Sequence, residues 1–345
     1  MYQVGGCKVM KKFKVVLTDN IFPDLELEKR MLSEANAELV EVENPDNLAD
    51  AVVEADAVIN TYMLLPAEII NKMQKCKLII RNGIGVNTID IEAASKKGIM
   101  VANIPTYCLD EVSTHTVALL LACNRKIAYL NNEVKSANWN VKLAIPIYSL
   151  QDKILGLLGF GKISQLVSRK IKAFGMKVIT YDPYITQKVA DEYGVTVVDF
   201  ETLLKDSDYL SIHCPLTDET RGLLNYSAFK MMKKTAYVIN TARGPIINEK
   251  DLITALKEGE IAGAGLDVLQ TDGVDPDNPL LKMDNVIITP HSAWYSEESI
   301  IRRRTQTIEN VIKVLQGGEP DSFINKNDYT LNSALFIKLT VTDAK

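Results

Sequence analysis

The stretch Gln151-Asp-Lys-Ile-Leu-Gly-Leu-Leu-Gly-Phe-Gly-Lys-Ile-Ser164 decides how the rest of this chain can fold. It begins with a short apolar run, Ile154 to Leu158, which has the length and composition of a strand buried in a parallel sheet. Gly159-Phe-Gly161 then turns the chain into a helical segment, whose free backbone N–H groups can bind a pyrophosphate. The stretch therefore predicts a strand–turn–helix unit with an anion site at its turn.

A second apolar strand follows the helical segment and ends in an acidic residue. Lys177 to Tyr181 precedes Asp182, about 20 residues past the glycine turn, where a carboxylate can accept both ribose hydroxyls of NAD. Ser164 replaces the third glycine of the usual fingerprint and is small enough to be tolerated there, at some cost in packing. We predict a dinucleotide site at Gly159, Phe160, Gly161, Lys162, Ile163 and Asp182. An ordinary βαβ turn without a ligand is the alternative.

Composition and charge narrow the class of protein. The chain has 345 residues, 47% hydrophobic and 24% charged, which is typical of a globular protein of two domains. Its net charge of -5, without a long basic run, argues against direct nucleic-acid binding. Five scattered cysteines without C-x-x-C spacing indicate reduced thiols, so we expect neither a disulfide framework nor a metal site. No apolar run is long enough to span a bilayer, and we expect a cytoplasmic protein without membrane contact.

On both sides of the glycine turn, apolar strands alternate with helical segments. This alternation predicts an α/β protein whose parallel sheets are covered on both faces. Residues 131–150 have weak periodicity, and we interpret them as an excursion from the globule. Residues 297–315 form a long amphipathic pattern that ends at Gly317-Gly318, which predicts a final helix.

Ligands of an open parallel sheet collect beyond the carboxyl ends of its strands, so the residues that follow each strand are the candidates. Arg243 can bind a carboxylate through two hydrogen bonds, and His291 can pass a proton near neutral pH. A carboxylate against the other ring nitrogen would favour the imidazolium. No side chain supplies a hydride, whereas nicotinamide does. This inventory suits proton-coupled hydride transfer to a carbonyl.

Each of these residues also has an ordinary structural explanation. An arginine after a strand is commonly a surface ion-pair partner, and Gly244-Pro245 marks a turn whatever Arg243 does. Asp272 lies in a run with Asp275 and Asp277 that a solvated loop would also show. The residues alone therefore indicate an NAD-dependent oxidoreductase and leave the catalytic roles open.

Six stretches in order resemble the D-isomer-specific 2-hydroxyacid dehydrogenase family over about residues 13–325. They are residues 155–161, 174–183, 213–220, 239–244, 263–268 and 285–291. His291-Ser-Ala-Trp-Tyr-Ser-Glu297 further resembles the branch that contains the C-terminal binding proteins, transcriptional co-repressors that keep a dehydrogenase fold.

The resemblance implies two doubly wound parallel-sheet domains, a Rossmann cofactor domain inserted into a flavodoxin-like substrate domain. The substrate domain would comprise residues 1–109 and 293–330, the NAD-binding domain residues 110–292, and a C-terminal tail residues 331–345. The implied activity is NAD-dependent interconversion of a small 2-oxo acid and its D-2-hydroxy acid by a homodimer, with the excursion around Trp139 embracing the second subunit. A dinucleotide-sensing, co-repressor-like protein-binding module is the alternative.

The resemblance also assigns roles to single residues. Arg243 would hold the substrate carboxylate, His291 would be the acid/base, and Asp272 would stand where the family has its catalytic glutamate. Further cofactor contacts fall on Thr116, Cys214, Pro215, Thr220, Thr241, Ala242 and Asp267. Substrate contacts fall on Arg81, Gly83, Ile84, Gly85 and Trp294. Arg81 favours a polar distal group and Trp294 an apolar one, so the identity of the acid stays open.

Overall fold

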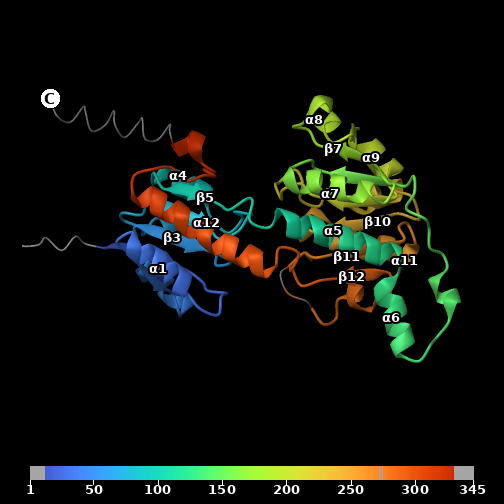
Figure 1. Ribbon diagram of the computed structural model, residues 1–345, viewed down its shortest axis with the longest axis horizontal. Coiled ribbons are helices and arrows are strands. Elements are labelled where there is room, and N and C mark those ends of the chain that lie inside the picture. The colour runs from blue at the N-terminus through green and yellow to red at the C-terminus, as the bar shows by residue number, and fades with distance from the viewer. Residues whose placement is uncertain (1–11, 272, 274, 330–345) are drawn as a thin grey trace, which may run out of the picture. The chain divides into compact units, whose positions relative to one another are not determined.

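A computed structural model of the chain describes residues 12–271, 273 and 275–329. The chain packs into two compact units and passes between them twice, after Tyr107 and after Ser296. The sequence predicted these crossings after residues 109 and 292. The expected tail, residues 331–345, lies outside the described residues. Each unit is an α/β structure and is described by itself (Figure 1).

The first unit is built on a five-stranded parallel sheet in the order β2-β1-β3-β4-β5. Its strands are β1 (Phe13–Leu17), β2 (Ala37–Glu41), β3 (Ala57–Asn60), β4 (Leu78–Arg81) and β5 (Met100–Ala102). This strand order is the flavodoxin-like one, so the expected fold of this unit is confirmed.

Helices cover both faces of this sheet. On one face α12 (Glu297–Leu315) packs on β3 and β4 beside α1 (Glu26–Glu34). The opposite face buries an apolar cluster under the short helices α2 (Leu48–Ala51), α3 (Ala67–Ile70) and α4 (Ile91–Lys96), with the 3-10 turn η1 (Pro45–Asn47) before α2. The predicted final helix is α12, and its observed limits are the predicted ones.

The second unit contains a seven-stranded parallel sheet in the order β12-β11-β10-β9-β6-β7-β8. Its strands are β6 (Ile154–Leu158), β7 (Lys177–Tyr181), β8 (Thr196–Val197), β9 (Tyr209–Ile212), β10 (Tyr237–Asn240), β11 (Gly263–Leu266) and β12 (Val286–Ile288). Counted from β6, this is the Rossmann order 3-2-1-4-5-6 extended by one strand. The glycine turn follows the strand at which the order reverses, where ligands of such sheets bind.

Two apolar cores lie on the two faces of this sheet. On one face α5 (Leu109–Asn124) packs against α7 (Lys162–Lys172) and the strands β10 to β12. The other face carries α9 (Phe200–Asp206), α10 (Tyr226–Met231) and α11 (Glu249–Glu258). Shorter connecting helices are α8 (Gln187–Asp191), η3 (Gly244–Ile246) and η4 (Pro279–Lys282).

The expected excursion begins as a helix. α6 (Ile127–Lys135) follows α5, and η2 (Val141–Ala144) lies farther along the same connection (Figure 1). Neither of these two described segments has a buried residue. This explains the weak periodicity of the sequence, because no face of α6 is selected by burial in the single chain.

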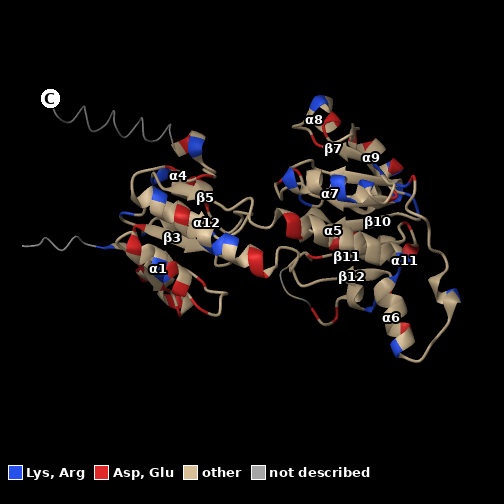
Figure 2. Ribbon diagram, viewed as in Figure 1, with Lys and Arg blue, Asp and Glu red and all other residues tan. Residues whose placement is uncertain are grey.

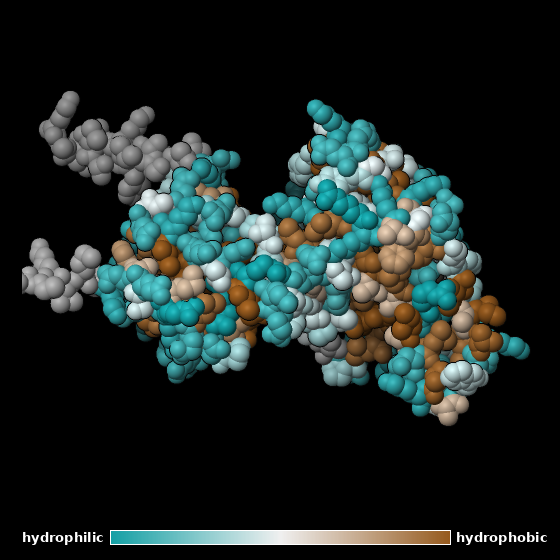
Figure 3. Space-filling model, in the orientation of Figure 1, coloured by the Kyte–Doolittle hydropathy of each residue, from teal (hydrophilic) through white to brown (hydrophobic). Residues whose placement is uncertain are grey.

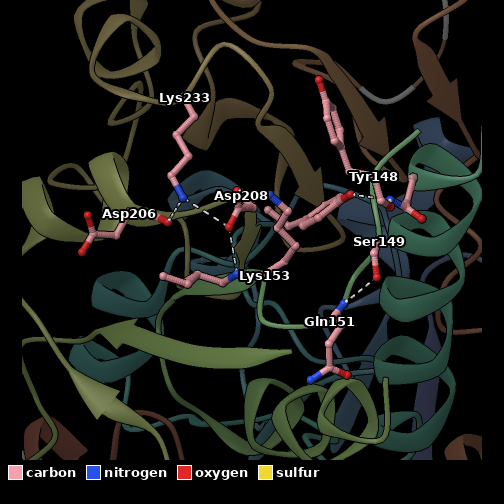
Figure 4. A network of polar contacts seen from close by, with 10 residues as sticks. Tyr148, Ser149, Gln151, Lys153, Asp206, Asp208 and Lys233 are labelled. Atoms are coloured by element: carbon pink, nitrogen blue, oxygen red, sulfur yellow. Dashed lines mark hydrogen bonds and ion pairs between the residues drawn. The ribbon is translucent and has the colours of Figure 1, made fainter. Parts of the chain in front are cut away.

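At the amino ends of β6, β9 and β10, one aspartate ties three strands together (Figure 4). The Asp208 carboxylate accepts the N–H of Ile154 at 2.9 Å and pairs with the ammonium groups of Lys153 at 3.5 Å and Lys233 at 3.2 Å. Its backbone carbonyl accepts the N–H of Tyr237 at 3.1 Å. Asp208 thus fixes the start of the central strands, at the end of the sheet opposite to the glycine turn.

Candidate functional site

The glycine turn at the carboxyl end of β6 is shaped for close approach. Gly159 has a φ of +94°, and a Cβ at this position would lie 2.8 Å from the backbone nitrogen of Cys214, so glycine is required. Gly161 is the N-cap of α7, and a Cβ there would meet no atom within 4 Å. The helix N-terminus therefore faces open space, as an anion-binding turn must.

Asp182 lies beside this turn, at the carboxyl end of β7. Its two carboxylate oxygens accept the N–H groups of Phe160 and Tyr184, each at 2.8 Å. Two backbone donors thus hold the carboxylate next to the glycine turn, where it can accept ribose hydroxyls. The residues present fit a dinucleotide.

Ser164 stands where the fingerprint usually has its third glycine. It is fully buried, and its hydroxyl donates to the carbonyl of Gly161 at 2.9 Å. The serine keeps its polar group satisfied within the first turn of α7, so its burial leaves no unpaired hydroxyl.

The loop after β9 carries three further cofactor candidates. The Thr220 hydroxyl donates to the carbonyl of Pro215 at 2.7 Å and so closes this loop. Burial raises the pKa of the Cys214 thiol to about 11. Cys214 therefore stays protonated near neutral pH and lines the turn as a small, uncharged side chain.

Arg243 lies in the turn after β10. Its backbone carbonyl accepts the side-chain N–H of Asn240 at 3.0 Å, and its Nη1 donates to the carbonyl of Ala242 at 2.7 Å. A Cβ at Gly244 would lie 1.6 Å from the carbonyl oxygen of Leu269. The Arg243 turn and the loop after β11 are therefore in backbone contact, which only glycine permits at this point.

Asp267, the first residue after β11, holds the loop that carries His291. One carboxylate oxygen accepts the Thr289 hydroxyl at 2.6 Å and the N–H of Ser292 at 2.9 Å, and the other accepts the N–H of Ala293 at 2.9 Å. The backbone carbonyl of Asp267 accepts the N–H of His291 at 2.8 Å. Four hydrogen bonds from one buried residue thus fix the backbone on both sides of the histidine.

His291 itself has a left-handed backbone conformation, with a φ of +51°. Such a conformation is uncommon for a residue with a side chain, and it persists only where the surrounding contacts enforce it. The contacts of Asp267 supply that constraint. Strain at a histidine on the ligand-binding edge of a parallel sheet is typical of a functional position.

Two neighbouring residues of α5 reach this edge of the sheet. Thr116, a predicted cofactor contact, lies 2.8 Å from Thr241, between the hydroxyl oxygens. The sequence did not single out His115, whose Nε2 lies 2.9 Å from the Thr289 hydroxyl and 3.6 Å from Asp267. A signal existed, since Glu111 and His115 lie one turn apart in the polar amino-terminal half of α5, on the same face of the helix.

The predicted substrate contacts of the first unit gather on the loop after β4. Asn82, next to Arg81, accepts Nε–H of Arg303 and the hydroxyl of Thr307, each at 3.0 Å. The carbonyls of Gly83 and Ile84 accept the N–H of Ile104 at 2.9 Å and the side-chain N–H of Asn103 at 2.6 Å. The loop that contains Gly83, Ile84 and Gly85 is therefore held at three successive residues.

The remaining candidates are Arg81, Trp294 and Asp272. The guanidinium of Arg81 lies 5.6 Å from the ring centre of Tyr62, within the first unit. Trp294 belongs to the second unit, three residues after His291, and its ring contacts that of Tyr295 edge-on at 5.7 Å between centroids. Asp272 lies outside the described residues.

The described part of the chain lacks two further kinds of feature. Over residues 12–271, 273 and 275–329, no three His, Cys, Asp or Glu side chains are grouped as metal ligands would be. In the same residues, no helix has the length and apolar character that crossing a membrane requires.

Comparison with known proteins agrees with this geometry. Residues 117–293, which make up half of the chain, match the family described as D-isomer specific 2-hydroxyacid dehydrogenase, NAD binding domain. The chain belongs to the D-isomer-specific 2-hydroxyacid dehydrogenase family. This match confirms the predicted family and cofactor, because the NAD-binding domain of the family coincides with the second unit and its glycine turn.

Curated relatives and solved structures extend the match to most of the chain. It is 38% identical to D-3-phosphoglycerate dehydrogenase of Methanocaldococcus jannaschii over 90% of this chain and 59% of the relative. It is 34% identical to glyoxylate reductase of Korarchaeum cryptofilum over 81% of this chain and 85% of the relative. D-lactate dehydrogenase of Aquifex aeolicus, solved with NAD and lactic acid, is 30% identical with a TM-score of 0.82, over 90% of this chain and 98% of the other.

The relatives differ in length as well as in substrate. The chain spans 59% and 49% of the phosphoglycerate dehydrogenases of Methanocaldococcus jannaschii and Archaeoglobus fulgidus, but 85% of the glyoxylate reductase. Family membership therefore leaves the reaction and the substrate of this chain to be proposed.

Proposed function

We propose that the protein is an NAD-dependent oxidoreductase that interconverts a small 2-oxo acid and its D-2-hydroxy acid. The proposal rests on the residues that follow the strands at the carboxyl edge of the seven-stranded sheet. The carboxyl ends of β6, β7, β10 and β12 present the glycine turn, Asp182, Arg243 and a histidine held in a constrained loop. Relatives that act on glyoxylate, hydroxypyruvate, phosphoglycerate and lactate support it.

The roles of the binding residues follow from their chemistry. The N-terminus of α7 would hold the pyrophosphate, and Asp182 would accept hydrogen bonds from the adenosine ribose. Arg243 forms two parallel hydrogen bonds with the substrate carboxylate, which orients the neighbouring carbonyl. On the resemblance of the sequence alone, we assign further substrate contacts to Arg81 and to the loop of Gly83 to Gly85.

His291 moves the proton. In reduction it donates a proton to the carbonyl oxygen while the carbonyl carbon receives a hydride, which is the chemistry that a bound reduced nicotinamide supplies. The 2-oxo acid thus gains one hydride and one proton and becomes a 2-hydroxy acid. In oxidation the neutral imidazole takes the hydroxyl proton instead.

The proposed carboxylate partner of His291 is Asp272, on the resemblance of the sequence alone. Aspartate is one methylene shorter than the glutamate usual in the family, and it would still stabilise the imidazolium that reduction requires. Asp272→Asn should therefore shift the fall of the reduction rate to lower pH. An unchanged pH profile in this variant would contradict the assignment.

The experiment that tests the activity is a panel of acids. Glyoxylate and hydroxypyruvate are reduced with NADH, and D-lactate and D-3-phosphoglycerate are oxidised with NAD, while the absorbance of the reduced nicotinamide is followed. We expect turnover of at least one pair, with a D-configured product for the chiral acids. Binding of NADH without turnover of any acid would contradict the proposal and favour a dinucleotide-sensing, protein-binding role.

We propose a preference for NAD(H) over NADP(H). Asp182 would repel a 2′-phosphate, and the following residues, Pro183-Tyr184-Ile185-Thr186, include no basic side chain. We expect Asp182→Ala to reduce the ratio of catalytic efficiencies with NADH and NADPH by about tenfold, which corresponds to the loss of one interaction of about 1.4 kcal/mol. A parent enzyme that is equally efficient with NADPH would contradict the preference.

We also propose that the functional form is a homodimer in which the excursion of each chain, residues 131–150, packs against the partner chain. Trp139, Val141 and Ile145 are 88%, 84% and 72% exposed in the single chain, although they are large and apolar. A hollow of about 410 Å³ lies beside them and is lined by α5, α6, η2 and the residues before β12. Apolar residues gather on this part of the surface (Figure 3).

A second copy fits this surface because the same chain offers both an exposed apolar segment and a hollow to receive one, as a two-fold interface requires. Light scattering of the purified protein should give the mass of a dimer, and Trp139→Asp should shift it toward the monomer. A parent protein that is monomeric at micromolar concentration would contradict this proposal.

A further inference from the structure

The amino-terminal half of α5 supports the two loops to which we assign chemistry. Glu111 accepts the hydroxyl of Ser296 at 2.8 Å, and His115 contacts the hydroxyl of Thr289 at 2.9 Å. These two contacts lie on either side of His291. Thr116 contacts Thr241, two residues before Arg243, at 2.8 Å. Figure 2 shows the acidic first turn of α5, which contains Glu111, in red.

The direction of the hydrogen bonds at Thr289 follows from its single proton. The Thr289 hydroxyl donates to the Asp267 carboxylate at 2.6 Å, because a carboxylate can only accept. The same hydroxyl oxygen must then accept from Nε2–H of His115, which lies 2.9 Å away. His115 is therefore a donor at Nε2, in either its neutral or its charged form.

This chain of contacts ends at the backbone of His291. His115 donates to Thr289, Thr289 donates to Asp267, and Asp267 holds the amides of Ser292 and Ala293. The same aspartate accepts the N–H of His291 through its backbone carbonyl. The left-handed conformation of His291 thus depends on a carboxylate whose own orientation is set from α5.

We propose that His115 is a positioning residue for His291. It acts through Thr289 and Asp267, and it keeps the imidazole of His291 where a proton can reach the reacting oxygen. The inference deepens the proposed function and depends on it, because it assumes that His291 is the acid/base. A displacement of about 1 Å at such a group is enough to slow a reaction by about a hundredfold.

Two substitutions of His115 distinguish the hydrogen bond that its Nε2–H donates from the space that its side chain fills. The side-chain amide nitrogen of glutamine can take the place of Nε2 and donate to Thr289, so His115→Gln keeps the hydrogen bond. Asparagine is one methylene shorter and places its amide nitrogen near Nδ1, so His115→Asn loses it. Thr289→Ser keeps the hydroxyl that contacts His115 and Asp267, whereas Thr289→Val removes it. These two variants test the next contact in the same way.

The experiment compares kcat, KM and NADH affinity across these four variants of the full chain. We expect His115→Asn and Thr289→Val to lower kcat by about 10- to 100-fold, with the dissociation constant of NADH changed less than about threefold. His115→Gln and Thr289→Ser should stay within about threefold of the parent. Thr114→Ala is the control, since it removes a contact of α5 with Lys170 of α7 on another side of the helix.

A second measurement does not need turnover. Hydrogen exchange of the peptide that contains residues 289–296 should speed up in His115→Asn and stay near the parent rate in His115→Gln. Equal exchange in both variants, or a kcat that is normal in His115→Asn, would overturn the inference. Equal loss of activity in the glutamine and asparagine variants would also overturn it, because it would assign His115 a purely structural role.

Failure of this inference is distinguishable from failure of the proposed function. His291→Ala tests the function directly, because it removes the imidazole and leaves the backbone contacts of Asp267. If His291→Ala keeps full reductase activity, the proposed acid/base is wrong whatever the His115 variants do. If His291→Ala is inactive while His115→Asn is normal in both kcat and exchange, only the positioning role is wrong.

Discussion

Two buried aspartates lie at opposite ends of the same parallel sheet and differ in most of their partners. Asp208, at the amino end, is 8% exposed; its carboxylate accepts one backbone N–H and pairs with two lysines that keep part of their surface in water. Asp267, at the carboxyl end, is 1% exposed and is surrounded by backbone amides, a hydroxyl and an imidazole.

The partners of each aspartate match the role of its end of the sheet. Flexible lysines neutralise Asp208 without requiring one geometry, which suits a contact that ties strands together. Two backbone amides and one hydroxyl fix the orientation of the Asp267 carboxylate, which suits a contact that orients a neighbouring residue. Substitutions at the amino end should therefore change stability, and those at the carboxyl end should change catalysis.

Arg243→Lys should have the largest effect. The lysine keeps the charge but loses the planar pair of donors, so kcat/KM should fall at least about a hundredfold, or roughly 3 kcal/mol in the transition state. Steady-state kinetics with NADH and the best 2-oxo acid measure this. Lys233→Arg, the reverse exchange at the amino end, is the control and should leave kcat/KM within about twofold. Near-normal activity of Arg243→Lys would return this arginine to a structural role.

Asp267→Asn tests the carboxyl end of the comparison directly. The amide can accept with only one of its two terminal atoms, so it cannot hold Thr289, Ser292 and Ala293 at once, and the His291 loop loses its constraint. We expect kcat to fall by about 10- to 100-fold. Asp208→Asn, assayed in parallel, should keep the parent kcat. Equal kcat values for the two variants would contradict the different roles assigned to the two aspartates.

Asp208→Ala should lower stability without lowering activity. It leaves the N–H of Ile154 without its acceptor, while both lysines can regain water, so the free energy of unfolding should fall by about 1–3 kcal/mol. Chemical unfolding followed by fluorescence measures the change. A parent-like midpoint would show that the three strands are held by their backbone ladder alone.

His213 should give the smallest effect, and it depends on pH. Burial lowers the pKa of this imidazole from 6.5 to about 3, and its Nε2 lies 2.9 Å from the Ser211 hydroxyl. Below pH 6.5 the His213 imidazole is protonated in the unfolded chain but stays neutral in the folded chain. The free energy of unfolding therefore decreases as the pH falls from 6.5 toward 3. Between pH 7 and pH 5 the loss at this one site should be about 1–2 kcal/mol.

The measurement for His213 is the slope of unfolding free energy against pH, compared between the parent and His213→Gln. Glutamine does not titrate, so the variant should lose less stability over the same interval. The same slope in both proteins would mean that His213 binds its proton equally well in the folded and the unfolded chain.

The elements near the glycine turn were predictable because their signals are local. The strand of Ile154 to Leu158, the turn at Gly159 and the acid at Asp182 lie within 29 residues, and each follows from the geometry that its neighbours allow. The final helix was predictable for the same reason, since apolar periodicity and a glycine stop define it. α6 was not, because no buried face selects its pattern.

Short stretches of sequence were enough to predict the fold class, the dinucleotide turn and the candidates Arg243 and His291, because strand ends and turn residues are local features. The contact of His115 with a loop 174 residues away, and the orientation of the His291 backbone by Asp267, became visible only in the folded chain. The folded chain alone also shows that Asp208 draws three strands together. Such roles depend on which segments the sheet order brings side by side, and no local pattern carries that information.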